Sequence, residues 1–255
     1  MNLKREAFAA LHQKGDPLLL YNVWDVGSAK AVAGAGATAL ATGSRSLAGA
    51  LGFDDGEQIP FNLFLDTVRR IAAAVDLPLT ADFEGGFAAD PVRLADHAQY
   101  LAEAGAIGCN FEDQRIGGEG LHPLDEQARR VAAVVSAGLF VNARTDVFLQ
   151  PMMAGRDPND RTLMTEALER AAAYAEAGAQ CFFAPSLSDL DLIAELCRDC
   201  PLPVNVMMRA GMPSVTELAA AGVARVSWGP GPWREAMAGV AARAAELYGT
   251  GPRLD

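Results

Sequence analysis

The sequence predicts an α/β protein of the (β/α)8 TIM-barrel class, built as a single domain over residues 1–255. From residue 18 onward, short apolar runs alternate with Ala-, Arg- and Glu-rich stretches, which is the pattern of βα units on a parallel sheet. Eight such units fit into about 250 residues, the typical length of a TIM barrel. No shift in composition marks a second domain, and the chain is long enough to bury one large core.

The expected strands are apolar runs bounded by turn-forming residues. They cover residues 18–24, 37–41, 79–83, 108–111, 140–143, 181–184, 204–207 and 224–228. The expected helices between them cover residues 28–34, 61–74, 91–104, 124–137, 160–177, 188–199, 213–221 and 232–248. A further charged amphipathic helix is predicted at residues 1–13. Four helices lead into Ala-Gly-Ala or Ala-Gly-Val segments that fit helix C-caps, at Gly36, Gly105, Gly178 and Gly222.

The net charge of −11 and the isoelectric point near 4.7 argue against nucleic acid or an anionic membrane surface as a partner. Both are bound by clustered Lys and Arg, whereas here acidic residues are spread along the chain. No apolar run approaches the roughly 20 residues needed to span a bilayer. The N-terminal segment also lacks the apolar core of a signal peptide. We therefore expect a cytoplasmic protein without membrane partners.

Four cysteines do not form a disulfide framework in a chain of this length. Cys197 and Cys200 form a Cys-Arg-Asp-Cys motif, but Cys109 and Cys181 lie in apolar runs and offer no second ligand pair. Because structural zinc needs about four ligands, we expect buried or half-buried free thiols.

The segment Leu77–Phe87 carries the strongest chemical signal. If its first part is a strand, Thr80, Asp82 and Glu84 project to one face because side chains alternate. Two carboxylates that close raise each other's pKa unless a cation lies between them, and a hard divalent ion with oxygen ligands is the usual solution. The pattern indicates a metal or acid/base site. The alternative is a solvated strand end with two surface acids.

Polar residues also collect where other predicted strands end, which is where TIM-barrel enzymes carry their active sites. They are Asn22, Trp24, Asp25, Thr42, Ser44, Asn110, Glu112, Asp113 and Asn205.

Arg144 follows the fifth predicted strand and shares its parity with Asn142 and Asp146. An inward-facing Arg among acids is either a structural ion pair or an anchor for a substrate carboxylate. We favour the anchor, because the planar guanidinium binds a carboxylate through two bonds. For Asn142 and Asp146, a layer of paired polar groups filling the barrel stays an alternative.

Five motifs together resemble the phosphoenolpyruvate mutase/isocitrate lyase superfamily, including its carboxyphosphonoenolpyruvate phosphonomutase-like proteins. These motifs are YNVWDVGSAK, the Gly-Ser loop before LGFDDGE, TADFEGGF, NFEDQ and VNARTD, and they extend over residues 20–230. The resemblance implies a (β/α)8 barrel that binds Mg²⁺, or alternatively Mn²⁺, together with a small 2-oxo or 2-hydroxy carboxylic acid. It also implies cleavage of a C–C or P–C bond and a homo-oligomer, either a dimer or a tetramer.

The resemblance assigns roles to individual residues. Asp82 matches the acid that touches the metal directly and so lies beside the substrate. Three acids match those that hold the metal through water, namely Asp55, Glu84 and Glu112. Arg144 matches the arginine on the substrate carboxylate, and the backbone of Gly43, Ser44 and Arg45 matches the loop that cradles the carboxylate and oxo oxygens. Further pocket residues are Trp24, Asp25 and Asn205.

The chain departs from the superfamily in the segment 114–122. Lyases there carry Lys-Lys-Cys-Gly-His, whose Cys gives a proton to the leaving enolate, but this segment has neither Cys nor Lys. A lysine and a histidine of phosphonopyruvate-processing members align with Gly118 and Pro185. These departures argue against an isocitrate or methylisocitrate lyase route and weaken a mutase assignment. Members usually lend a terminal helix to a neighbouring subunit. The sequence does not by itself predict this exchange, because the chain stops soon after its eighth helix.

The expected function is Mg²⁺-dependent cleavage of a small 2-oxo dicarboxylate of the oxaloacetate type, by decarboxylation or hydrolysis through a metal-stabilised enolate. Hydrolysis needs a base, for which Asp55 and Glu84 are candidates. His122 would protonate the enolate if its loop closes over the site, and otherwise it is a solvated loop residue. His12 and His97 are expected at the surface. The alternatives are a non-catalytic barrel that binds 2-oxo acids, a phosphonomutase-like or methylisocitrate lyase-like activity, and a scaffolding barrel.

Overall fold

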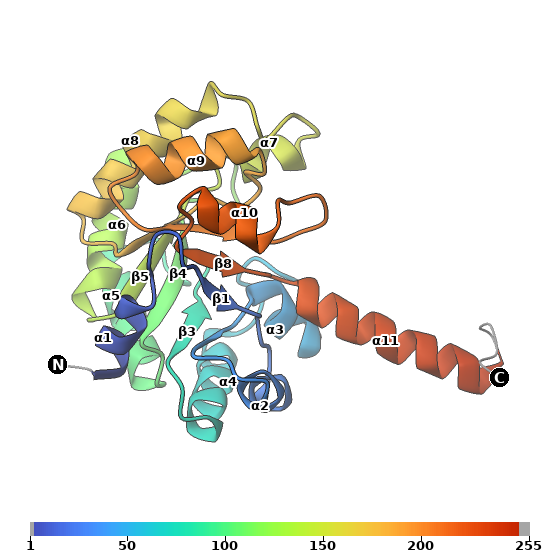
Figure 1. Ribbon diagram of the computed structural model, residues 1–255. Coiled ribbons are helices and arrows are strands. Elements are labelled where there is room, and N and C mark those ends of the chain that lie inside the picture. The colour runs from blue at the N-terminus through green and yellow to red at the C-terminus, as the bar shows by residue number, and fades with distance from the viewer. Residues whose placement is uncertain (1–2, 250–255) are drawn as a thin grey trace.

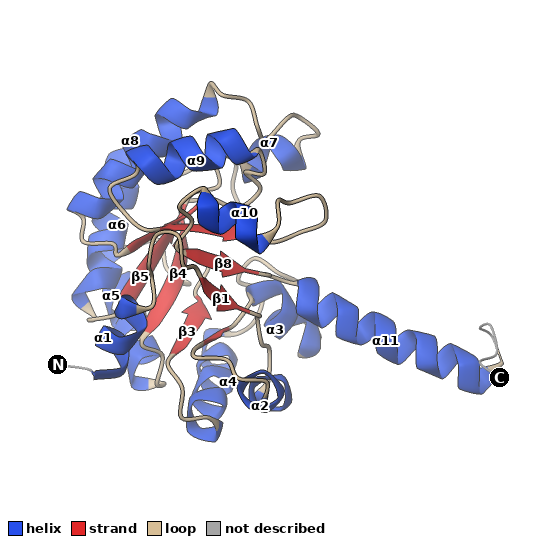
Figure 2. Cartoon of the chain, in the orientation of Figure 1, coloured by secondary structure: helices blue, strands red, loops and turns tan. Residues whose placement is uncertain are grey.

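A computed structural model describes residues 3–249 of the chain. Its eight parallel strands are ordered β1-β8-β7-β6-β5-β4-β3-β2, and helices surround them (Figures 1 and 2). Between β1 and β2, a parallel bridge joins Val23 to Thr42, and the Val23 N–H donates to the Ala41 carbonyl oxygen at 2.8 Å. The sheet is therefore a nearly closed barrel, and the predicted fold class is confirmed.

All eight predicted strands are present. They are β1 Leu18–Leu20, β2 Leu40–Ala41, β3 Leu79–Asp82, β4 Gly108–Glu112, β5 Phe140–Arg144, β6 Cys181–Phe183, β7 Val204–Met207 and β8 Arg225–Ser227. The first two strands are shorter than predicted. In particular, β1 ends at Leu20, and the chain beyond it turns toward the next helix.

The helices match the predicted ranges to within a few residues, with two additions. They are α1 Leu3–Ala10, α2 Val26–Gly34, α3 Ser44–Ala50, α4 Phe61–Ala74, α5 Pro91–Glu103, α6 Leu124–Ser136, α7 Leu149–Met153, α8 Leu163–Glu176, α9 Leu190–Asp199, α10 Val215–Ala220 and α11 Gly231–Tyr248. The short helices α3 and α7 were not predicted. The first two residues of the predicted N-terminal helix lie outside the described residues.

The barrel wall separates two kinds of side chain. Outward-facing residues of β3 such as Leu79 and Ala81 join the main hydrophobic cluster with the surrounding helices. At the end of the barrel where the strands begin, Phe8 of α1 packs with Leu18 and Phe140 in a second cluster. Arg225 at the start of β8 is fully buried beside this cluster, 5.9 Å from the centre of the Phe8 ring.

His12 follows α1 and is only 7% exposed, so its predicted surface position is wrong. Its ring lies 4.8 Å from that of Phe8 and 4.5 Å from that of Phe140. Burial and the charge of Arg225 lower the pKa of His12 to about 3, so the neutral ring is the stable form. His97 is half-buried and stacks on Phe61 at 4.1 Å. A lone histidine on an amphipathic helix carries no sequence signal that separates these two situations.

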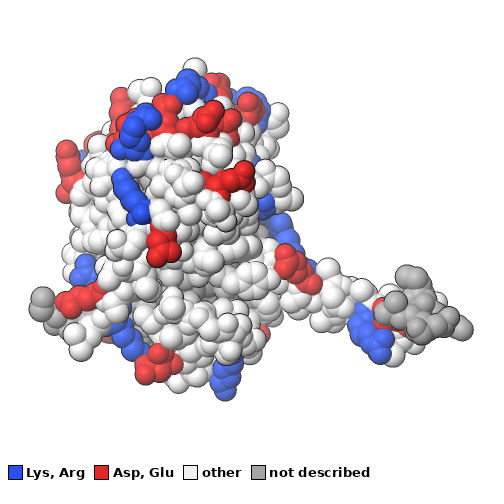
Figure 3. Space-filling model, viewed as in Figure 1, with Lys and Arg blue, Asp and Glu red and all other residues white. Residues whose placement is uncertain are grey.

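The four cysteines are free and buried, as predicted. Among residues 3–249, no helix combines the length and apolar character that crossing a membrane would require. On the face shown in Figure 3, acidic and basic side chains are scattered, and the centre around β1 and β8 carries few charges.

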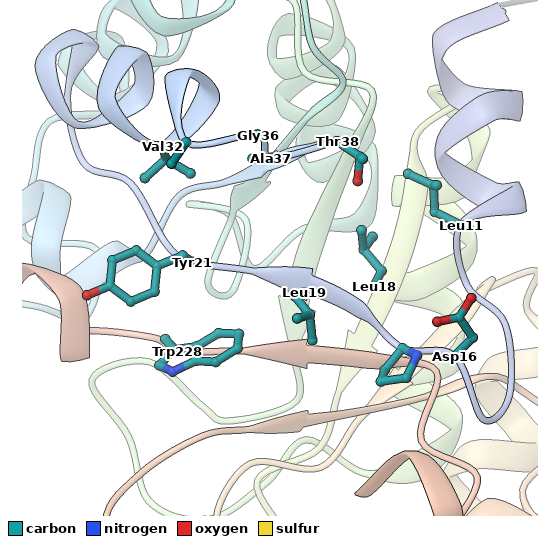
Figure 4. A pocket seen from close by; sticks show the side chains of 12 residues that line it. Leu11, Asp16, Leu18, Leu19, Tyr21, Val32, Gly36, Ala37, Thr38 and Trp228 are labelled. Atoms are coloured by element: carbon teal, nitrogen blue, oxygen red, sulfur yellow. The ribbon is translucent and has the colours of Figure 1, made fainter. Parts of the chain in front are cut away.

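The last helix, α11, extends away from the barrel instead of lying along it (Figure 1). Pro232 at its start is the one residue of α11 that is buried. Beside its base, a groove of about 600 Å³ opens on the outer wall of the barrel. Figure 4 shows Leu19, Tyr21, Val32 and Trp228 around this groove, contributed by β1, α2 and the end of β8.

Candidate active site

Asp82 ends β3 and is held by backbone and side-chain groups of the neighbouring strand end. Its carboxylate Oδ2 accepts the N–H of Ser44 at 2.9 Å, at the first residue of α3. Its own N–H donates to Thr42 Oγ1 at 2.9 Å. The structure thus brings Asp82 together with Ser44 of the segment Gly43–Arg45.

Glu84 lies beyond the end of β3, and its φ of 51° places it in the left-handed region. The strand alternation that predicted its direction therefore stops at Asp82. The Glu84 carboxylate is 5% exposed and accepts the N–H groups of Gly56 and Glu57 at 2.9 and 3.0 Å. Burial raises the pKa of Glu84 to about 8, together with the negative charges of Asp82, Asp55 and Glu57. A like-charge neighbourhood of this kind is what a bound cation would relieve.

The other predicted acids belong to the same neighbourhood. Burial and the charge of Asp82 raise the pKa of Asp55. Burial raises the pKa of Glu112 well above its usual range, and Asp82 and Glu84 add to this effect. Each of the four acids predicted for the metal thus lies within electrostatic reach of at least one other. Arg45 faces Asp55 on the rim, with 4.0 Å between Nε and Oδ2.

Arg144 is paired on both sides. Its Nη1 lies 2.8 Å from Glu112 Oε2, and its Nε and Nη2 lie 2.6 and 2.9 Å from the two oxygens of Asp146. Burial would lower the pKa of Arg144, but the charges of Asp146 and Glu112 raise it well above its usual value. Asn142 donates to Asn110 Oδ1 at 2.8 Å. The structural ion pair is therefore present for Arg144, and the alternative of paired polar groups holds for Asn142 and Asp146.

A buried network behind β5 fixes this arrangement, and sequence reasoning missed most of it. Asp113 Oδ1 accepts the N–H of Asp146 at 2.8 Å. Asp113 Oδ2 accepts from Thr145 Oγ1, Tyr174 Oη and Arg170 Nη1 at 2.7, 2.8 and 3.2 Å. An acid directly after Glu112 at a strand end was the available signal for Asp113. Its partners Arg170 and Tyr174 lie on α8, more than fifty residues away, and no sequence signal pointed to them.

Three predicted pocket residues have other contacts. Asp25 is the N-cap of α2, and its Oδ1 accepts the Ser28 N–H at 2.7 Å, while the Trp24 N–H donates to Ser28 Oγ at 3.0 Å. Asn205 is fully buried. Its Oδ1 accepts from Ser227 Oγ at 3.5 Å, and its Nδ2 has no partner among the described residues.

His122 lies at the base of a small hairpin in which Gln114 pairs with Leu121. Its ring Nδ1 is 2.9 Å from Glu126 Oε1, and burial together with the charge of Arg130 lowers its pKa. It lines a pocket of about 450 Å³ with Glu57 and Arg130, and neither the four acids nor Arg144 line that pocket. In this arrangement of the hairpin, His122 is not brought to the acids.

The carboxylates suit a divalent cation bound mostly through water. Within residues 3–249, no three Asp, Glu, His or Cys side chains are gathered closely enough to hold an ion by direct contacts alone. Mg²⁺ usually keeps several waters and binds through one or two carboxylates. An all-oxygen donor set in which burial and neighbouring acids raise the pKa values of Asp55, Glu84 and Glu112 fits such an ion.

Comparison with known proteins finds relatives in sequence and in fold. A proposed phosphonomutase from Burkholderia cenocepacia J2315 is 46% identical, with a TM-score of 0.91, over 95% of this chain and 99% of that one. The 2-methylisocitrate lyase of Escherichia coli (strain K12) is 29% identical over 211 residues, 78% of this chain and 68% of the lyase. A phosphonopyruvate hydrolase in complex with oxalate and Mg²⁺ shares the fold at 24% identity and a TM-score of 0.82, over 97% of this chain and 88% of that one.

The family model of phosphoenolpyruvate phosphomutase matches residues 8–248, nearly the whole chain. The chain therefore belongs to the phosphoenolpyruvate phosphomutase family, part of a superfamily of lyases and mutases that act on small carboxylic acids.

Proposed function

We propose that this protein is a Mg²⁺-dependent enzyme that cleaves the C–C bond of a small 2-oxo dicarboxylate, with oxaloacetate as the first candidate. The observation that supports this proposal is the convergence of Asp55, Asp82, Glu84 and Glu112 beside Arg144 at the carboxyl ends of the strands. The reaction is decarboxylation or hydrolysis. Mn²⁺ could replace Mg²⁺, since both take oxygen ligands.

Each residue has a defined task in this proposal. Asp82, oriented by the Ser44 N–H and by Thr42, would hold the ion directly, and the other three acids would hold it through water. The ion supplies Lewis-acid stabilisation of the negative charge that develops on the oxo oxygen. Arg144 spends three of its five N–H groups on Glu112 and Asp146, which leaves donors for a substrate carboxylate.

The proton transfers are assigned to two of the four acids and to His122. For hydrolysis, Glu84 is a suitable base because its carboxylate would be ionised once the cation is bound, and Asp55 on the rim is the other candidate. His122 would serve as proton donor only after the hairpin 114–122 moves, because its ring now contacts Glu126. Otherwise water protonates the enolate.

The test is an assay of the purified protein with Mg²⁺ against oxaloacetate, methylisocitrate and phosphonopyruvate. We expect the wild type to turn over oxaloacetate and Asp82→Asn to be inactive. Asp54→Asn is the control and should stay active, since Asp54 is an exposed acid next to Asp55. Clear cleavage of methylisocitrate without turnover of oxaloacetate would reverse this ranking. It would instead favour the activity named for the Escherichia coli relative.

A second candidate is a barrel that binds 2-oxo acids without catalysis. The observation in its favour is the segment 114–122, which has no Cys or Lys to act on a bound acid. Calorimetric binding of 2-oxo acids without product formation would support this candidate.

We also propose that the protein is a homo-oligomer, a dimer or a tetramer, in which α11 of one protomer covers the groove beside β1 of another. Exposed apolar side chains on α11 such as Met237 and Val240 are 42% and 63% accessible, and Leu19 in the groove is 46% accessible. In a TIM barrel, a ring of helices normally covers the outer face of the strands. Light scattering should give a dimer or larger, and Val240→Glu should dissociate it. A monomeric wild type would contradict the proposal.

A further inference from the structure

Two loops at the mouth of the barrel hold each other through reciprocal hydrogen bonds. The Asp55 loop, residues 53–59, donates the N–H groups of Gly56 and Glu57 to Glu84 Oε2 at 2.9 and 3.0 Å. The Glu84 loop, residues 84–90, returns the contact, because the Phe87 N–H donates to Glu57 Oε1 at 2.7 Å. The backbone of Gly85 also bonds the Glu57 carboxylate.

The backbone of both loops is held in an unfavourable conformation at these residues. Glu57, Glu84 and Phe87 have φ values of 58°, 51° and 55°. Residues other than Gly rarely have positive φ values. Such a backbone conformation persists where surrounding contacts impose it. The reciprocal bonds are the contacts that impose it here.

Arg130 of α6 grips the same Glu84 loop from its carbonyl side. Its Nη2 donates to the Gly85 carbonyl oxygen at 2.7 Å, and its Nη1 donates to those of Ala88 and Ala89 at 3.1 and 2.9 Å. The guanidinium also lies over the Phe111 ring, 5.5 Å from its centre. Glu57 and Arg130 therefore fix the loop from its N–H side and its carbonyl side.

Glu57 is separated from the chemistry itself. Its Oε1 is occupied by the Phe87 N–H, and its side chain lines the pocket that contains His122, not the acid cluster. However, the amide that Glu84 binds at Gly56 is the peptide that directly follows Asp55. A change in the position of Glu57 therefore changes the separation of Asp55 and Glu84.

We propose that Glu57 is a positioning residue that sets the spacing of the Asp55 and Glu84 carboxylates and thereby the affinity of the site for a divalent cation. This role rests on the proposed metal function. Glu57 would then lie outside the metal site and still determine the positions of two of its carboxylates, in the way that outer partners orient metal ligands.

The test measures Mn²⁺ binding by electron paramagnetic resonance of the free ion. We expect Glu57→Ala to weaken Mn²⁺ binding about 10- to 100-fold, the range found for outer partners of metal ligands. Glu57→Gln should retain most of the affinity, because its amide oxygen can still accept the Phe87 N–H. The matched control is Asp54→Ala, which removes an exposed acid of the same loop and should bind as the wild type does. Circular dichroism checks that each variant is folded.

A second measurement does not involve the metal. Amide hydrogen exchange at Phe87 should accelerate in Glu57→Ala and stay protected in Glu57→Gln. Unchanged exchange at Phe87, or wild-type Mn²⁺ affinity in a folded Glu57→Ala, would overturn the positioning role. A wild type that binds no Mn²⁺ would instead refute the proposed metal function, and with it the role of Glu57 toward a cation.

Discussion

Arg144 and Asp146, two residues apart at the end of β5, form a two-point ion pair with Nε–Oδ1 and Nη2–Oδ2 distances of 2.6 and 2.9 Å. Asp146 is fully buried, and its backbone N–H is anchored by Asp113. The pair thus holds the guanidinium in one direction before any substrate arrives. This kind of preorganisation is what a carboxylate anchor requires.

Removal of Asp146 should therefore be costly. Removing one partner of a buried ion pair leaves the guanidinium of Arg144 with Glu112 as its remaining carboxylate, and we expect Asp146→Ala to lower the free energy of unfolding by about 3 kcal/mol. Urea denaturation measures the change. The control is Glu166→Ala, which removes a 53% exposed partner of Arg170 and should cost less than about 1 kcal/mol. Equal losses in both variants would contradict the structural importance of the Arg144–Asp146 pair.

Binding of Mg²⁺ should release a proton. The pKa of Glu84 is raised to about 8 by burial and by neighbouring acids, so its carboxyl is mostly protonated at pH 7. A dication favours the ionised form, so about one proton should leave per bound ion at pH 7, and affinity should rise as the pH approaches 8. Calorimetry in buffers of different ionisation enthalpy measures the release, and Glu84→Gln should abolish it. A buffer-independent binding enthalpy in the wild type would contradict the prediction.

The same shift of Glu84 affects stability without metal. The folded pKa lies above the ordinary value of 4.5, so the folded state binds the proton more tightly than the unfolded state. This contribution to stability is complete below pH 4.5 and is lost as the pH rises through about 8. Thermal unfolding should therefore show a larger gain from Mg²⁺ at pH 8 than at pH 5. A gain that does not change with pH would argue against this shift.

His12 predicts a loss of stability on the acid side. Its pKa falls from 6.5 to about 3 in the folded state. Between pH 6.5 and pH 3, the unfolded chain therefore binds a proton at His12 that the folded chain does not bind. The contribution is complete above pH 6.5 and is lost as the pH falls toward 3. From pH 7 to pH 5, the wild type should lose about 2 kcal/mol more than His12→Gln. Parallel pH profiles of the two proteins, measured by urea unfolding, would show that His12 does not titrate this way.

Asp25 offers a test between two roles. The sequence predicts a pocket residue, whereas the structure shows its carboxylate capping α2. A capping role alone predicts that Asp25→Ala costs about 1 kcal/mol of stability and leaves KM unchanged. A rise in KM at unchanged kcat would assign the residue to the substrate pocket. Ser214→Ala, the matched cap of α10, controls for the loss of a cap elsewhere.

The barrel and its acids could be predicted because both follow from local patterns. Apolar runs with a fixed rhythm define the strands, and a parallel barrel places every strand end on one rim, so Asp82, Glu112 and Arg144 had to meet. Glu57 could not be found this way. Its partner Phe87 is thirty residues away, and its role depends on a backbone contact between two loops. Similarly, helical periodicity predicted α11 but not its direction away from the barrel.

Sequence reasoning also misjudged positions at which helices and loops compete. Ser44 to Ala50 was predicted as loop, but the segment after Gly43 coils into α3, and its first N–H holds Asp82. The segment is too short and too rich in Gly, Ser and Ala to show a helical hydrophobic periodicity.

The aromatic cluster of Phe8 and Phe140 closes the barrel at the end where the strands begin, within the described part of the chain. Any solute that exchanges with the acids must then cross the opposite rim. The substrate and both products would then pass through the same open end of the barrel, so a product that dissociates slowly would block the next turnover. For such an enzyme, inhibition by its own products would be a direct result of architecture.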